Sequence, residues 1–251
     1  MKKLIFFLTI VFLTNLGMAQ QNKNLSLLIF SKTNGFRHDA IPAATEAFKK
    51  IALENKWKVE FTEDSTVFNS QNLSRFNVVV FLLTTGDILN DEEQLAFEEF
   101  FKKGGGLLTL HTGTDTEYKW PWYGELIGAH FIGHPPTQKV TLVMEDKTNP
   151  ATKHFGKDRL EWEDEFYSFN RNPRPDVKVL ISIDESTFSK TKPEELKQKN
   201  LQMGDHPLVW CREFDGGRVF HTGLGHVPGL YSNPLMIKHL VGAIKWVAGI
   251  E

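Results

Sequence analysis

The chain has 251 residues, enough for one large domain or two small ones. Apolar residues make up 41% of it and charged residues 24%, which is the balance of a soluble globular protein. The formal net charge is −2, so the chain lacks the strongly basic character that nucleic-acid binding requires. We therefore expect no nucleic acid among its partners.

The first residues have the pattern of an export signal. Residues 1–3 form a short positive segment, residues 4–16 are almost purely apolar, and residues 17–19 offer small side chains for cleavage. A membrane anchor is the weaker alternative, because the apolar run is too short to span a bilayer comfortably. We predict a signal peptide over residues 1–19, no stable membrane anchor after its removal, and a periplasmic or secreted protein.

Strands and helices alternate through the first half of the chain. Apolar runs predict strands at residues 25–30, 58–62, 76–83 and 107–110. Apolar spacing and N-terminal signals predict helices at residues 41–55 and after Asn90. This alternation predicts βαβ units, and therefore an α/β fold with a doubly wound, mostly parallel sheet of the flavodoxin-like type and helices on both faces.

The regularity breaks after His111. Residues 118–136 form a long insertion rich in aromatic residues, Gly, Pro and His, which we expect to be a functional loop. Further predicted elements are strands at 139–144 and 177–183, a hairpin at 208–214 and 218–221, and a helix at 234–247. Residues 184–203 are polar and are expected to be exposed. No domain linker is evident, so we predict a single domain over residues 25–248.

Histidines recur where the predicted strands end. His38 follows the first strand, His111 the fourth and His226 the last glycine loop, while His130 and His134 lie in the aromatic insertion. The carboxyl ends of parallel strands meet at one edge of a sheet, so these imidazoles are expected to converge with nearby carboxylates. Imidazole and carboxylate together suit a divalent metal such as Zn²⁺. The alternative is that some of these rings only bind loop carbonyls.

The candidate site residues form three overlapping groups. The predicted metal ligands are His38, His111, His130, His134 and His226. The predicted catalytic residues are His111, His38 and Glu165, with Glu165 as a base. The predicted sugar-binding residues are Trp120, Trp122, Tyr123 and Asp115, because flat aromatic faces suit sugar rings. Packing of the three aromatic residues as a minor core at the sheet edge is the open alternative.

Five separated motifs resemble the ThuA-like (trehalose utilisation) family. They are Gly35-Phe36-Arg37-His38, Gly104-Gly105-Gly106 with Leu110-His111, Gly128-Ala129-His130-Phe131 with His134-Pro135, His206-Pro207-Leu208-Val209-Trp210, and Gly217-Arg218-Val219-Phe220 with Leu224-Gly225-His226. The resemblance runs from about residue 25 to residue 248. It implies an α/β fold of the class I glutamine amidotransferase-like superfamily.

The superfamily often has a nucleophilic cysteine at its strand-to-helix elbow. His111 occupies that position here, and the only cysteine, Cys211, lies a hundred residues further on in a strand-like run. An imidazole cannot form the thioester that glutamine hydrolysis needs. We therefore expect no glutamine amidotransferase activity, whatever the fold.

The resemblance also implies a role in disaccharide catabolism, beside dehydrogenases that make 3-keto-glycosides. A ketone at C3 acidifies the C2 proton, so a base can remove it and eliminate the glycosidic oxygen, with a metal on the ketone. The expected protein is a metal-assisted hydrolase or lyase acting on a small carbohydrate. A non-catalytic sugar-binding module and a partner-binding scaffold stay open as alternatives, as does a homo-oligomer.

Overall fold

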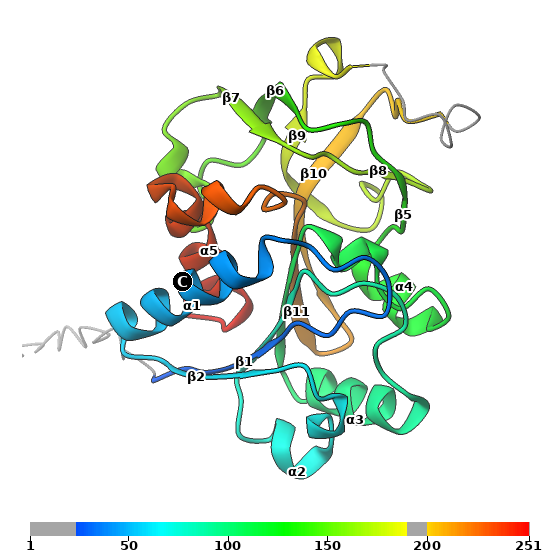
Figure 1. Ribbon diagram of the computed structural model, residues 1–251, viewed down its shortest axis with the longest axis vertical. Coiled ribbons are helices and arrows are strands. Elements are labelled where there is room, and N and C mark those ends of the chain that lie inside the picture. The colour runs from blue at the N-terminus through cyan, green and yellow to red at the C-terminus, as the bar shows by residue number, and fades with distance from the viewer. Residues whose placement is uncertain (1–23, 190–199, 251) are drawn as a thin grey trace, which may run out of the picture.

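The computed structural model describes residues 24–189 and 200–250 (Figure 1). The predicted signal peptide lies outside the described residues, as does part of the polar segment after residue 184. In the described part of the chain, no helix combines the length and the apolar character needed to cross a bilayer.

A nine-stranded sheet forms the centre of the described structure. Its parallel part consists, in sheet order, of β2 (Lys58–Thr62), β1 (Ser26–Phe30), β3 (Val78–Leu82), β4 (Gly106–Leu110) and β11 (Gly217–Thr222). Its antiparallel part continues with β10 (His206–Phe214), β9 (Lys178–Ile183), β6 (Gln138–Met144) and β7 (Arg159–Asp164). A separate pair joins β5 (Phe131–Gly133) to β8 (Ser168–Phe169).

Helices cover both faces of the sheet (Figure 1). One face carries α1 (Ile41–Asn55) and α5 (Pro234–Val247), and the other carries α2 (Ser70–Leu73), α3 (Asp91–Lys102) and α4 (Pro121–Ile127). Side chains alternate along a strand, so Leu27 and Ile29 pack under α1 and α5 while Leu28 and Phe30 pack on the opposite side.

The predicted α/β class is confirmed, with a mixed sheet in place of a mostly parallel one. The short turn at Asp215-Gly216 joins β10 to β11, and it explains why strand pairing changes from parallel to antiparallel at β11. A connection this short can join only antiparallel neighbours, whereas parallel neighbours need a long crossover. Beyond β11, the sheet therefore continues through antiparallel pairs, in the order β10, β9, β6 and β7.

Helix α3 shows why the helices begin where the sequence predicts. The Asn90 side chain accepts the backbone N–H groups of Glu92 and Glu93, and the Glu93 side chain accepts the N–H of Asn90 in return. Asp91 and both glutamates also lie at the positive end of the helix. At the start of α5, Asn233 caps in the same way by accepting the N–H of Leu235.

The prediction that the insertion after Tyr118 is a loop is wrong in part, because the segment contains α4 and β5. Pro121 lies in the first turn of α4, a position that needs no backbone donor. Tyr123, Leu126 and Ile127 share one buried face of this short helix. Gly128, at a φ of 92°, ends it.

Candidate metal centre

Four side chains from distant segments converge at the carboxyl edge of the parallel strands. His38 follows β1, His111 follows β4 directly, and His226 follows β11, while Glu165 is the first residue after β7. One potential ligand atom from each of these four residues lies within 4.8 Å of the others. We call these four residues the histidine cluster. Ligands bind at this edge in open α/β sheets, so the cluster lies where the topology favours a site.

The backbone turns sharply at one cluster residue and directly before another. His111 has a φ of 50°, which non-glycine residues rarely adopt, and its N–H donates to the Thr222 carbonyl of β11 at 2.7 Å. Gly225, with a φ of 114°, precedes His226, and a Cβ there would lie 2.6 Å from the Tyr231 hydroxyl. Strain of this kind concentrates at functional sites.

Asp164 positions two members of the cluster through their backbone. It is fully buried and accepts the N–H groups of Gly225 at 2.7 Å, His226 at 3.1 Å, Val227 at 3.1 Å and Glu165 at 3.0 Å. Burial raises the pKa of Asp164 to about 7, and the four N–H donors act in the opposite direction. Asp164 was not among the candidate residues predicted from the sequence.

Three ring nitrogens of the cluster are buried without a hydrogen-bond partner: His38 Nδ1, His111 Nε2 and His226 Nδ1. The ring centroids of these histidines lie 5.1–5.2 Å apart. A buried polar atom without a partner costs free energy, and an ion is one of the groups that can satisfy it.

The hydrogen bonding of His111 defines its tautomer. Its Nδ1 lies 3.3 Å from the Gly223 carbonyl oxygen, which can only accept, so Nδ1 carries the proton and donates. In the neutral ring, Nε2 then presents a lone pair, and it lies 3.5 Å from Glu165 Oε1. Two acceptors that face each other need a cation or a proton between them.

The cluster histidines stay neutral because they are buried. Burial, helped by the neighbouring imidazoles, lowers the pKa of His38 to about 3. Burial also lowers the pKa of His111 to about 3, and it lowers the pKa of His226. Neutral imidazole is the form that binds metal. Three neutral imidazoles and a carboxylate therefore form a group that could hold a divalent ion of the Zn²⁺ type.

His134 lies beside the cluster. Its Nδ1 is 3.0 Å from Glu165 Oε2 and also 3.0 Å from the Pro135 carbonyl oxygen, so Nδ1 faces two acceptors and carries a proton. The side chain is 32% exposed, which makes it the most accessible imidazole in contact with Glu165. His134 was predicted as a metal ligand, but this geometry resembles that of a histidine oriented by a carboxylate.

His130, also predicted as a metal ligand, lies outside the cluster. Its ring turns towards the backbone that follows β4, where Nδ1 lies 3.3 Å from the Thr114 carbonyl oxygen, and it stacks on Tyr118. A ring that binds a loop carbonyl was the alternative weighed from the sequence. We no longer assign a ligand role to His130.

The three aromatic residues predicted to bind sugar pack into the core instead. We call Trp120, Trp122 and Tyr123 the aromatic cluster. Trp120 is 5% exposed and Tyr123 fully buried, and Trp122 packs half-buried beside Trp120. Their polar tips are also satisfied, at Glu98, Asp215 and the Gly113 carbonyl. Trp120 and Tyr123 offer no accessible face, and Trp122 packs against Phe97, Phe101 and Phe214, so we no longer assign substrate binding to these three residues.

Asp115, the fourth predicted sugar-binding residue, lies at the edge of the site. It is half-buried and accepts a 2.6 Å hydrogen bond from the Tyr118 hydroxyl. Burial raises the pKa of its carboxyl group, while Tyr118 and His134 act to lower it. Asp115 is therefore near enough to His134 to interact with it electrostatically.

The remaining buried histidines have structural partners. His239 Nδ1 donates to the Ala151 carbonyl, and His221 Nδ1 bonds the Thr109 hydroxyl, while His221 Nε2 is buried without a hydrogen-bond partner. His206 lies between the Glu185 carboxylate and the Tyr167 carbonyl oxygen. The Tyr167 ring covers His111 at 4.3 Å between centroids, so His206 supports one wall of the cluster from behind.

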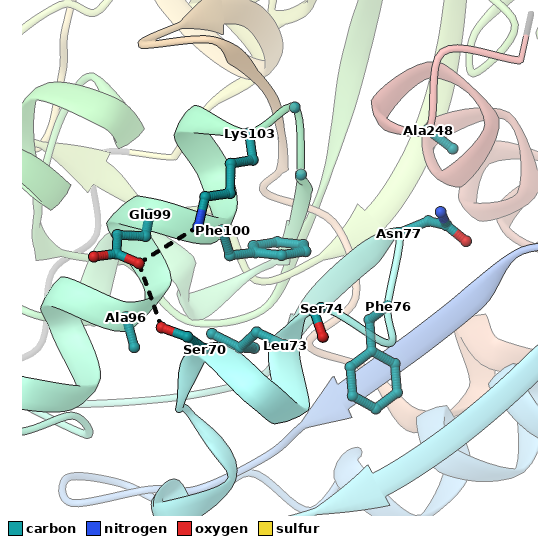
Figure 2. A pocket seen from close by; sticks show the side chains of 12 residues that line it. Ser70, Leu73, Ser74, Phe76, Asn77, Ala96, Glu99, Phe100, Lys103 and Ala248 are labelled. Carbon is teal, nitrogen blue, oxygen red and sulfur yellow. Dashed lines mark hydrogen bonds and ion pairs between the residues drawn. The ribbon is translucent and has the colours of Figure 1, made fainter.

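A cavity at the opposite edge of the sheet has a different character (Figure 2). It lies between α2, α3 and the amino ends of β3 and β4. Its charged groups pair with one another, since Glu99 lies 3.5 Å from Lys103 and accepts from Ser70 at 3.3 Å (Figure 2). This cavity therefore offers neither unpaired imidazole nor unpaired carboxylate.

Comparison with known proteins shows what the chain is similar to. The family model described as ThuA, trehalose utilisation, matches residues 26–247. A ThuA-like protein from Bacteroides uniformis is 22% identical with a TM-score of 0.73, covering 89% of this chain and 91% of its own. A ThuA-like protein from Parabacteroides merdae is 21% identical with a TM-score of 0.69, covering 90% of each chain. A cytoplasmic protein from Salmonella typhimurium is 13% identical with a TM-score of 0.58, covering 89% of this chain and 98% of its own. No curated protein matches significantly.

Proposed function

The chain belongs to the ThuA (trehalose utilisation) family, and from this premise we propose that it is a secreted, metal-dependent enzyme acting on a keto-sugar derived from a disaccharide. The family supports a function related to carbohydrates. The metal dependence, the keto-sugar and the export are the proposal's own additions, the last of them based on the expected signal peptide over residues 1–19.

One observation carries the proposal of metal dependence. The histidine cluster collects three neutral imidazoles and one carboxylate, and each of the three rings keeps one buried nitrogen without a hydrogen-bond partner. At His239, by contrast, both ring nitrogens have partners. A single unpaired nitrogen also occurs at His221, so the feature that carries the proposal is the gathering of three such nitrogens around one carboxylate. His38, His111, His226 and Glu165 would be the residues that hold the ion.

A keto-glycoside is a substrate whose chemistry fits such a site. A bound divalent ion would polarise the ketone oxygen at C3 and so acidify the proton at C2. A base removes that proton, and the electron pair of the C2–H bond becomes the C1–C2 double bond as the C1–O bond breaks. The departing oxygen then takes up the proton from the protonated base, so the elimination needs no other reactant.

His134 is the residue we propose as that base. Glu165 and the Pro135 carbonyl hold its Nδ1–H, so the basic lone pair of the neutral ring lies on Nε2. A carboxylate that orients an imidazole in this way is a recurring arrangement in acid–base catalysis. Glu165, which was predicted as the base, would instead hold both the ion and the imidazole.

Metal analysis and an activity assay on the same samples test the proposal. We expect the purified protein to bind about one divalent ion per chain, and a chelator to abolish elimination from 3-keto-trehalose until metal is restored. His111→Ala is expected to lose both the ion and the activity. His134→Gln is expected to keep the ion and to lose at least about 100-fold in turnover, the range of general acid–base catalysis.

His154→Ala is the matched control, because His154 is a half-buried histidine that binds the Leu235 carbonyl outside the cluster. It is expected to keep both metal and activity. A protein that binds no Zn²⁺ or Mn²⁺ in calorimetry, or that turns over 3-keto-trehalose equally well after His111→Ala, would contradict the proposed function.

A further inference from the structure

Two aromatic side chains stay exposed beside the histidine cluster. Among the large apolar side chains in the described residues, Phe36 is 68% exposed, Tyr118 45%, Leu53 80% and Leu95 62%. Leu53 lies on α1 and Leu95 on α3, as is ordinary for single residues on helix surfaces. Phe36 and Tyr118 instead lie on loops at the edge of the sheet that carries the cluster.

Backbone bridges hold these loops side by side. Thr33 pairs with Thr85, and Gly86 pairs with Thr116, so the segments after β1, β3 and β4 continue as neighbours beyond the sheet. The Thr85 hydroxyl donates to the Phe36 carbonyl at 2.9 Å and fixes the first of these loops. The two exposed rings are therefore carried by loops that are tied together through the loop after β3.

Tyr118 has the geometry of a platform with one covered face. Its ring stacks on His130, with centroids 4.8 Å apart and 26° between the planes. Its hydroxyl donates to Asp115 at 2.6 Å, which holds the ring in place. The preceding residue, Glu117, is buried and accepts the N–H groups of Ile88 and Leu89, so the backbone is anchored as well. One ring face is thus supported while the ring as a whole stays 45% exposed.

Phe36 contacts a member of the histidine cluster directly. Its ring meets His38 edge to face, with centroids 4.9 Å apart. His38 is one of the four cluster residues, so anything bound against Phe36 lies beside the proposed ion site. Asp115 lies at the same edge and keeps acceptor capacity, because a carboxylate can accept about four hydrogen bonds.

We infer that Phe36 and Tyr118 form a carbohydrate-binding subsite beside the histidine cluster, with Asp115 accepting a sugar hydroxyl. The ligand class is a pyranoside, whose axial C–H groups match an aromatic face and whose hydroxyl groups match a carboxylate. This inference rests on the proposed function. In it, Phe36 and Tyr118 take the sugar-binding role that was first predicted for the aromatic cluster. The rings of these two residues are exposed and can therefore contact the sugar.

Calorimetric titration with trehalose and with 3-keto-trehalose tests the subsite. Tyr118→Ala and Phe36→Ala are each expected to weaken binding by about 3- to 10-fold, the range of an aromatic contact. Tyr118→Phe keeps the ring and is expected to recover most of the affinity. Leu95→Ala removes an exposed apolar side chain from α3 and is the matched control, with an affinity within about twofold of the wild type.

The outcomes separate this inference from the proposed function. An unchanged sugar affinity after Tyr118→Ala, or an equal loss of affinity after Leu95→Ala, would contradict the proposed subsite even if the protein is an active metalloenzyme. A wild-type protein that binds neither sugar would overturn it too. Metal content is measured on the same samples: a metal-free protein that still binds trehalose through Tyr118 would keep the subsite and overturn the enzyme.

Discussion

The histidine cluster and the aromatic cluster differ in how their polar atoms are satisfied. In the histidine cluster, three buried ring nitrogens have no hydrogen-bond partner. In the aromatic cluster, the indole N–H groups and the tyrosine hydroxyl all donate to oxygen acceptors. Both groups looked like site residues in the sequence. Single unpaired polar atoms also occur elsewhere, as at Trp162 and His221, so a site is recognised by several unpaired atoms gathered in one place rather than by residue type.

The two clusters also differ in what their removal should change. Satisfied, close-packed side chains stabilise the fold, so their loss is expected to lower the free energy of unfolding. Unsatisfied groups at a strained turn cost stability and are kept for function, so their loss is expected to affect binding more than folding. Substitutions in each cluster, measured for both stability and metal binding, test this contrast.

The largest effect is expected for Trp120→Ala. Trp120 is 5% exposed and packs against Phe97 and Tyr123, so removing its side chain should lower the free energy of unfolding by about 3–5 kcal/mol. Urea denaturation measures this loss, and metal content per folded chain should stay unchanged. Trp122→Ala is the matched control and should cost less, because Trp122 is only half-buried. Normal stability together with lost sugar binding would restore the sugar-binding interpretation of this cluster.

The next effect is expected for Asp164→Asn. The amide would turn an N–H₂ group towards backbone N–H donors that now face a carboxylate, which should loosen the loop carrying His226. Groups that orient metal ligands typically contribute about 10- to 100-fold in metal affinity. A Zn²⁺ titration measures the loss, with the exposed neighbour Glu163→Gln as control. Equal affinities for the two variants would show that the cluster does not depend on this carboxylate.

Most of the fold could be predicted because local patterns determine where its elements lie. The helices at residues 41–55 and 234–247 and the strand at 58–62 have the predicted bounds. The hairpin of β10 and β11 was predicted from its short turn. The order of the other strands after β4 could not be predicted, because antiparallel pairing between distant segments leaves no local pattern. The sheet is therefore mixed, and α4 was missed because its seven residues are too short for a clear helical period.

The candidate site was predictable where it depends on the parallel strands. His38, His111 and His226 follow β1, β4 and β11, and the rule that carboxyl ends of parallel strands share an edge brings them together. Glu165 comes from β7 at the far end of the antiparallel extension, so the rule alone could not place it. The separation of His130 from the cluster depends on where α4 and β5 turn the chain. The metal-binding and catalytic roles of these residues stay predictions.

The smallest expected effect, for Tyr123→Phe, tests whether the two clusters are independent. The Tyr123 hydroxyl donates at 2.7 Å to the carbonyl of Gly113, two residues after His111, and so joins the aromatic cluster to the turn that carries a proposed ligand. Losing one buried hydrogen bond should cost about 1 kcal/mol in unfolding free energy, measured in urea. Metal affinity should stay within about twofold, because His111 is also held by the β11 backbone at Thr222. A parallel fall in metal affinity would show that the aromatic cluster supports the site, which would make the two regions one cooperative unit.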